Sequence, residues 1–233
     1  MTAKKPLVVF DVNETLLDLE SVSPVFERIF GEKLAMRLWF ADLILYSEAL
    51  TLANVYVPFT DIGAAVMEML ASTRNVKVTE KDKRELTDTF ASMPPHRDVP
   101  ITLARLREAG FRLFTLTDNL FEIQTRQLES GGIAANFERR FSVDGVGRHK
   151  PSREAYVYVE SQLGAKPSDL LLIASHTWDI IGAVGAGWHG ALIKRPGNDL
   201  LAVGPQPEFA GKDLADVADQ LIARYSPQPQ PSM

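Results

Sequence analysis

The stretch that decides the fold is Leu7-Val8-Val9-Phe10-Asp11-Val12-Asn13-Glu14-Thr15, close to the start of the chain. Four apolar residues lead into a carboxylate, and such an unbroken run is typical of a strand buried on both faces of a parallel sheet. We expect Asp11 at the carboxyl end of this strand, the edge at which open α/β sheets bind their ligands. An aspartate at that point serves as a nucleophile, as a metal ligand or as an ordinary turn former.

The composition of the chain narrows the classes of function. Its 233 residues are enough for one large core and a second small domain, and 45% apolar with 24% charged residues is usual for a globular protein. The net charge of -5 argues against a nucleic-acid partner, which needs a basic surface. The chain contains no cysteine, which excludes disulfides and thiolate chemistry. No apolar run is long enough for a secretory signal or a membrane span, so we expect a cytoplasmic protein without a membrane partner.

A helical pattern follows the first strand and continues to about residue 97. Apolar residues recur at helical spacing between Lys33 and Val55, and further helical patterns cover 62–70 and 81–90. A proline-rich segment over 93–100 then breaks the helical pattern. We therefore predict an all-helical block over residues 17–97, inserted after the first strand.

Beyond this block, strand and helix patterns alternate along the chain. We expect the strands over 111–117, 140–143, 170–174 and 190–193, each next to a helical segment. Such alternation predicts an α/β fold, a doubly wound parallel sheet with helices on both faces, built from residues 1–16 and 98–225. The tail over 226–233 is rich in proline and glutamine and is predicted to be disordered.

Polar residues follow the ends of the predicted strands. In chain order they are Asp11 and Thr15, then Thr117, Asp118 and Asn119, then Lys150, and finally the segment 175–179. Because neighbouring strand ends meet at one edge of such a sheet, a single crevice would hold two carboxylates, a lysine and several hydroxyls. That set suits a carboxylate nucleophile kept ionised by a lysine, with a second acid to activate water. A turn aspartate, a surface lysine and helix-capping threonines are the alternatives.

In this order the motifs resemble those of the haloacid dehalogenase superfamily, and the helical block lies where that superfamily carries its cap. The four motifs match Asp11 to Thr15, Thr117, Lys150-Pro151, and the segment ending at Asp179. Within the superfamily the chain is most similar to the type II 2-haloacid dehalogenases. The features that carry this similarity are Trp178-Asp179, Tyr156 and Tyr56-Val57-Pro58-Phe59.

The resemblance implies a hydrolase that removes halide from a 2-haloalkanoic acid or a related small substrate through an aspartyl ester, with no metal and no cofactor. It also implies a homodimer. The catalytic residues it implies are Asp11, Lys150, Asp179, Thr15 and Thr117. The residues it implies for substrate binding are Asn13, Phe40, Phe59, Asp118, Asn119, Tyr156, Ser175, His176 and Trp178. For His176, a structural hydrogen-bonded role is the alternative, and for the aromatic residues it is core packing.

Two positions distinguish this chain from the phosphatases of the superfamily. Phosphatases carry a second aspartate two residues after the nucleophile, where this chain has Asn13, which cannot protonate a leaving alcohol. A halide needs no proton. Ser175 stands where phosphatases carry the first of the acids that hold magnesium, so we expect Lys150 to supply the positive charge instead.

Two other positions depart from the dehalogenase pattern. Phe40 stands where the group has a substrate-gripping arginine, and Arg37, one helical turn earlier, is the candidate replacement. Asp118 stands where asparagine is usual. These two positions leave open a protein with this fold but without dehalogenase activity. A magnesium-dependent phosphatase of the same superfamily is the other alternative.

Overall fold

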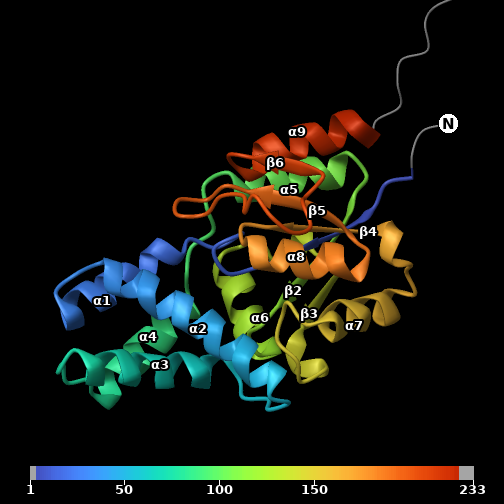
Figure 1. The fold of residues 1–233 in the computed structure, drawn as a ribbon. Helices are drawn as coiled ribbons and strands as arrows, with labels where there is room; N and C mark the ends of the chain where they lie inside the picture. The colour runs from blue at the N-terminus through green and yellow to red at the C-terminus, as the bar shows by residue number, and fades with distance from the viewer. Residues whose placement is uncertain (1–3, 226–233) are drawn as a thin grey trace, which may run out of the picture.

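The computed structural model describes residues 4–225, which form one parallel sheet flanked by helices (Figure 1). The sheet has six strands in the order β3-β2-β1-β4-β5-β6. The strands are β1 (Leu7–Phe10), β2 (Arg112–Thr117), β3 (Arg139–Ser142), β4 (Leu170–Ala174), β5 (His189–Ile193) and β6 (Phe209–Gly211). The predicted α/β fold with a parallel sheet is confirmed, and β6 is a strand that the sequence pattern did not predict.

The first strand lies in the middle of the sheet, as its apolar run predicted. It pairs with β2 on one side, Phe10 opposite Thr115, and with β4 on the other, Phe10 opposite Ile173. Val9 faces one apolar core and Val8 and Phe10 face the other, because successive side chains of a strand point to opposite faces. Burial on both faces explains why β1 has no polar residue before Asp11.

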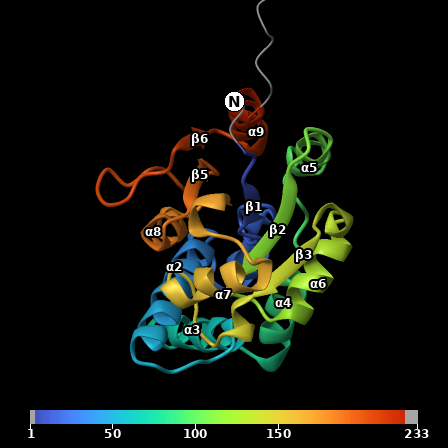
Figure 2. The same ribbon diagram turned by 90° about the vertical axis from the view of Figure 1, so that its right-hand side faces the viewer.

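Helices cover both faces of the sheet (Figures 1 and 2). On one face lie α5 (Val99–Glu108), α6 (Phe121–Ser130) and α9 (Leu214–Tyr225), which bury leucines against Val8 and Phe10. On the other face lie α7 (Arg153–Leu163) and α8 (Thr177–Ala186), which pack around Val9. Short 3-10 turns connect the elements: η1 (Leu19–Val22), η2 (Ala134–Asn136), η3 (Val143–Gly145) and η4 (Pro167–Asp169).

Four helices form a block on one side of the molecule, beside the loops that follow the strands (Figure 1). They are α1 (Ser23–Phe30), α2 (Leu34–Leu52), α3 (Phe59–Thr73) and α4 (Glu80–Phe90). Gly31, with a φ of 78°, ends α1 in the left-handed conformation that glycine adopts readily. Thr79 and Asp82 form a reciprocal capping box that begins α4.

The apolar core of this block is continuous with one face of the sheet. A single cluster of buried side chains contains Phe26, Trp39 and Met67 of the block together with Val8 and Phe10 of β1. The division into a core over 1–16 and 98–225 and a cap over 17–97 stays a prediction. The predicted disordered tail lies outside the described residues. Within residues 4–225, no helix is both long and apolar enough to cross a membrane.

Candidate active site

Asp11 follows β1 directly, and the turn after it fixes one of its carboxylate oxygens. The backbone N–H of Asp11 still donates to Ile173 O at 3.0 Å, and the chain then leaves the sheet. The Thr15 hydroxyl donates to Asp11 Oδ2 at 2.6 Å. The same hydroxyl accepts from the backbone N–H of Ser175 at 2.8 Å. Thr15 is therefore a donor of fixed direction toward Asp11, and it joins the ends of β1 and β4.

Lys150 lies between the two carboxylates that the sequence singled out. Its buried Nζ donates to Asp11 Oδ1 at 2.9 Å and to Asp179 Oδ2 at 2.6 Å. Asp118 Oδ2 is 3.7 Å from the same Nζ. Burial alone would lower the pKa of Lys150, but the three carboxylates raise it above its ordinary value. Lys150 is thus an ammonium ion shared by the acids around it.

The two carboxylates bound to Lys150 differ in their affinity for protons. Burial opposes ionisation of Asp11, but Lys150, His176 and Thr15 hold its pKa well below the ordinary range. Burial, with a contribution from the negative charge of Asp11, raises the pKa of Asp179 to about 6 against the pull of Lys150. Such a separation of the pKa values of two neighbouring acids is typical of pairs with different catalytic roles. Asp11 suits a nucleophile and Asp179 a general base.

Tyr156 on α7 holds the second carboxylate from the other side. Its hydroxyl donates to Asp179 Oδ1 at 2.7 Å and lies 3.1 Å from Asp179 O. Burial, together with the negative charge of Asp179, raises the pKa of Tyr156 well above its ordinary value, so the hydroxyl keeps its proton. Asp179 is consequently fixed by Lys150 on one oxygen and by Tyr156 on the other.

His176, between β4 and α8, lies beside the same nucleophile. Its Nδ1 is 3.2 Å from Asp11 Oδ2 and its Nε2 is 2.8 Å from Glu14 Oε2. Its ring stacks on Trp178 with centroids 5.1 Å apart, and Phe40 of α2 lies 5.6 Å away. Burial would lower the pKa of His176, but Asp11 and Glu14 raise it to about 9, so the ring is charged at neutral pH.

Glu14 is a buried site residue that the sequence reasoning missed. It has a φ of 61°, and its carboxylate bonds His176 on one oxygen and Arg37 of α2 on the other. Arg37 also bonds Glu20 and donates to Pro196 O at 3.1 Å, so it reaches Glu14 and not Asp11. The available signal for Glu14 was a charged residue in the turn between Asp11 and Thr15.

Asp118 fixes the loop that carries Lys150. Its Oδ1 accepts from the Lys150 backbone N–H at 2.9 Å and lies 3.3 Å from His149 Nδ1. His149 Nε2 in turn lies 2.9 Å from Val57 O in the helical block. His149, also missed, therefore connects the block to the site, and its position directly before Lys150 was the available signal.

The predicted substrate residues Asn13 and Asn119 bond to each other in a buried amide cluster. Asn119 Nδ2 donates to Asn13 Oδ1 and to Gln127 Oε1, both at 3.1 Å. Gln127 Nε2 donates to Asn13 Oδ1 at 3.1 Å and to Phe90 O at 2.9 Å. The Thr117 hydroxyl accepts from the Asn119 N–H at 3.3 Å, which fixes the turn after β2. This cluster holds the loops after β1 and β2 together.

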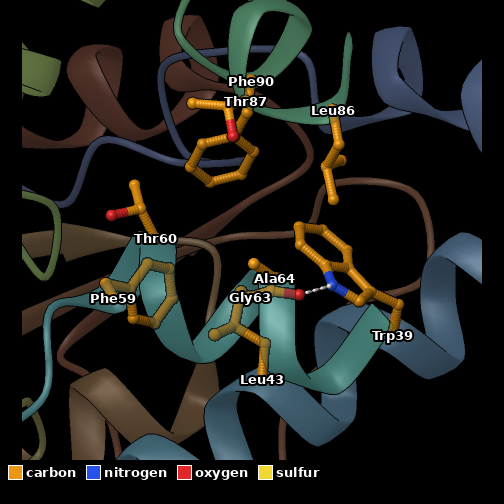
Figure 3. A pocket seen from close by; sticks show the side chains of 9 residues that line it. All are labelled: Trp39, Leu43, Phe59, Thr60, Gly63, Ala64, Leu86, Thr87 and Phe90. Atoms are coloured by element: carbon orange, nitrogen blue, oxygen red, sulfur yellow. Dashed lines mark hydrogen bonds between the residues drawn. The ribbon is translucent and has the colours of Figure 1, made fainter. Parts of the chain in front are cut away.

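A small pocket lies inside the helical block and is lined by Phe59, one of the predicted substrate aromatics (Figure 3). Phe59 and Trp39 line it, and the Trp39 indole N–H donates to Gly63 O at 2.8 Å (Figure 3). Its volume of about 20 Å³ suffices for roughly one water molecule. Phe59 also packs against His149, with ring centroids 5.9 Å apart. Phe59 thus contacts the loop before Lys150, whereas Phe40 contacts His176 of the candidate site.

A model of the haloacid dehalogenase-like hydrolases matches residues 5–187. The chain is 26% identical over 219 residues to haloacetate dehalogenase H-2 of Moraxella sp. strain B, covering 93% of this chain and 97% of that protein. It is 27% identical over 217 residues to (S)-2-haloacid dehalogenase 2 of Pseudomonas sp. strain CBS-3, covering 92% and 94% of the two chains.

Solved structures show the same architecture. The L-2-haloacid dehalogenase of Xanthobacter autotrophicus with chloropropionic acid covalently bound superposes with a TM-score of 0.86 at 21% identity, over 94% of this chain and 98% of that one. The fold is thus shared along almost the whole of both chains. Because the family model spans well over half of the sequence, the chain belongs to the haloacid dehalogenase-like hydrolases.

Proposed function

We propose that this chain hydrolyses the carbon–halide bond of a 2-haloalkanoic acid or a related small substrate through an ester on Asp11. The observation that carries the proposal is the Lys150 ammonium, 2.9 Å from Asp11 and 2.6 Å from Asp179. It keeps the first acid ionised beside a second acid with a raised pKa. The curated relatives with dehalogenase names support the same reaction class.

The reaction divides into two steps. In the first, a carboxylate oxygen of Asp11 bonds to the halogen-bearing carbon, and the halide leaves with the electron pair of the carbon–halogen bond. In the second, water adds to the carboxyl carbon of the ester, and Asp179 takes one of its protons. The alcohol product then leaves, and Asp11 is regenerated. Lys150 and Tyr156 hold Asp179 for this proton transfer.

We further propose that the reaction needs no metal. Lys150 Nζ already supplies Asp11 and Asp179 with the positive charge that a divalent ion would otherwise supply. Asn13 donates no carboxylic proton and is held by Gln127 and Asn119, which argues against the magnesium-dependent phosphatase.

The test is halide release from bromoacetate and from each enantiomer of 2-bromopropionate, with EDTA and with added magnesium. We expect turnover that EDTA leaves unchanged and that Asp11→Asn abolishes. Asp88→Asn, a change to an exposed acid on α4, is the matched control and should keep full activity. Hydrolysis of a phosphate ester that requires magnesium, without halide release, would favour the phosphatase. No turnover of either class would favour a protein without dehalogenase activity.

We also propose that two copies of the chain associate through α2. Leu34, Leu38, Leu45 and Leu52 are 68%, 49%, 55% and 84% exposed. Their spacings of four and seven residues return to one face of a helix, the pattern by which paired helices bury leucines. Sedimentation should give a dimer for the native chain and a monomer for a Leu38→Glu, Leu45→Glu variant, and a native monomer would contradict the proposal. The cytoplasmic location and the absence of a nucleic-acid partner stay predictions from sequence.

A further inference from the structure

The His176 ring lies in a position that calls for a proton on each nitrogen. Nε2 faces Glu14 Oε2 at 2.8 Å and Nδ1 faces Asp11 Oδ2 at 3.2 Å. Because ionised carboxylates only accept hydrogen bonds, two donors and hence an imidazolium fit this arrangement. The ring is 4% exposed, and its Nδ1 lies out of line for a hydrogen bond to Asp11 or to any other described residue. A buried charged donor therefore remains unused beside the nucleophile.

The surroundings of His176 hold the ring and its charge in place. Glu14 presents its carboxylate from a backbone with a φ of 61°, which a residue other than glycine adopts at a cost, and such costs concentrate at functional sites. Arg37 bonds the other oxygen of that carboxylate. Trp178 and Phe40 cover the ring with uncharged surfaces. Phe40 thus supplies a wall where the family resemblance implied a cation.

We propose that His176 is a catalytic residue of the second step, donating its Nδ1–H to the oxyanion that forms on Asp11 Oδ2 when water attacks the ester. This inference rests on the proposed function. Oδ2 accepts from the Thr15 hydroxyl and lies 3.2 Å from His176 Nδ1, so two donors are placed to stabilise a negative charge on it, whereas Oδ1 contacts Lys150. Oδ1 therefore becomes the ester oxygen and Oδ2 the carbonyl oxygen.

The bonds and protons of this step balance. Water adds to the carboxyl carbon, the carbonyl π electrons move to Oδ2, and Asp179 takes a proton from the water. The negative oxygen is then stabilised by the Thr15 hydroxyl and the His176 Nδ1–H, which tightens to it as charge develops. The electrons return, the bond from the carboxyl carbon to Oδ1 breaks, and the departing alkoxide receives the proton held by Asp179. The second proton of the water, left on the new carboxyl oxygen, then passes to Asp179 and on to solvent, because the site holds the pKa of Asp11 well below that of Asp179. The product hydroxyl oxygen comes from Asp11, and the new carboxylate oxygen comes from water.

The test follows the ester itself rather than overall turnover. Native enzyme, His176→Asn and His176→Gln are each mixed rapidly with bromoacetate, and the reactions are quenched at intervals. After digestion, mass spectrometry measures the fraction of the Asp11 peptide that carries the adduct. We expect the adduct to form in all three and to decay about 100-fold more slowly in the His176 variants, as expected for the loss of one oxyanion donor. An adduct that decays at the native rate in both variants would overturn the role of His176. No adduct in any of the three proteins would instead mean that the proposed function fails.

A second measurement keeps the inference testable if the His176 variants do not fold. The charge of His176 in the native protein is read from the nitrogen chemical shifts of its ring. The charged groups that face the ring are Asp11 and Glu14, with Lys150 beyond Asp11 and Arg37 beyond Glu14. We expect an imidazolium at neutral pH and a titration midpoint lowered by about one pH unit or more in Glu14→Gln.

Glu20→Gln is the matched control, because Glu20 bonds the same Arg37 but does not contact His176. Its titration midpoint should equal that of the native protein. In the native protein, ester decay should slow as the pH rises and His176 loses its proton. In Glu14→Gln this slowing should begin at a lower pH, the pH at which the His176 ring titrates in that variant. A neutral His176 ring at neutral pH in the native protein would overturn the proposal.

Discussion

Replacing Lys150 by Met tests how far the site depends on one buried ammonium. The substitution keeps the length and volume of the side chain but removes the donors at 2.9 Å from Asp11 and 2.6 Å from Asp179. It also removes the cation 3.7 Å from Asp118. Removing one partner of a buried ion pair costs about 3–5 kcal/mol because the remaining charge is left buried without compensation. We expect an unfolding free energy lower by about this amount at pH 7.5.

The decrease in unfolding free energy caused by Lys150→Met should depend on pH, because the pKa values of Asp11 and Asp179 depend on Lys150. In the native protein Lys150 helps to hold the pKa of Asp11 below its unfolded value, so this contribution is present above about pH 4 and is lost as pH falls through the folded pKa. Without Lys150 the pKa values of Asp11 and Asp179 rise, and the acids take up protons on folding. Lowering the pH therefore favours folding of the variant more than folding of the native protein. The difference in unfolding free energy between the two proteins should be smaller at pH 5 than at pH 7.5.

Urea unfolding followed by circular dichroism, extrapolated with a common slope at both pH values, measures this difference. Lys4→Met, which removes a surface ion pair with Asp169, is the matched control and should leave the unfolding free energy unchanged. A decrease in unfolding free energy below about 1 kcal/mol for Lys150→Met, or an equal decrease at both pH values, would contradict a buried ion pair between Lys150 and the two carboxylates.

Three further predictions concern the site. The rate of ester hydrolysis should rise as pH increases through about 6, where Asp179 loses its proton, and fall through about 9, where His176 does; a flat profile over this range would contradict both assignments. Tyr156→Phe removes a donor to ionised Asp179, so the acidic limb should move to higher pH, whereas in Tyr158→Phe on the same helix it should not move. Phe40→Ala should lower the unfolding free energy by about 3–5 kcal/mol, measured in urea, because it opens a cavity against the His176 ring; a loss near zero would show that the ring is not packed there.

Much of this architecture could be predicted from local pattern. The apolar run before Asp11 predicted a doubly buried strand, and similar apolar runs predicted the later strands. Strand β6 has only three residues and too little pattern to be identified. The placement of Lys150 between Asp11 and Asp179 was predictable because parallel strand ends share one edge of the sheet.

The partners of the amides and of His176 were not predictable in the same way. Asn13 and Asn119 stand in motif positions, but their orientation depends on Gln127, a helix residue with no motif signal. The Glu14 and His176 pair depends on a left-handed backbone conformation at Glu14, which no propensity predicts for a glutamate. Side-chain direction in the turn therefore decided these contacts, and sequence spacing does not encode it.

In the proposed reaction, Asp11 forms a transient ester whose carboxyl carbon is then attacked by water. A single turnover in heavy-oxygen water, with enzyme in excess over bromoacetate, tests this most directly. We expect one heavy oxygen to enter the peptide containing Asp11 and the product of this first turnover to carry only light oxygen. Heavy oxygen in the first product, with Asp11 unlabelled, would show direct attack of water on the substrate carbon and would contradict the ester mechanism.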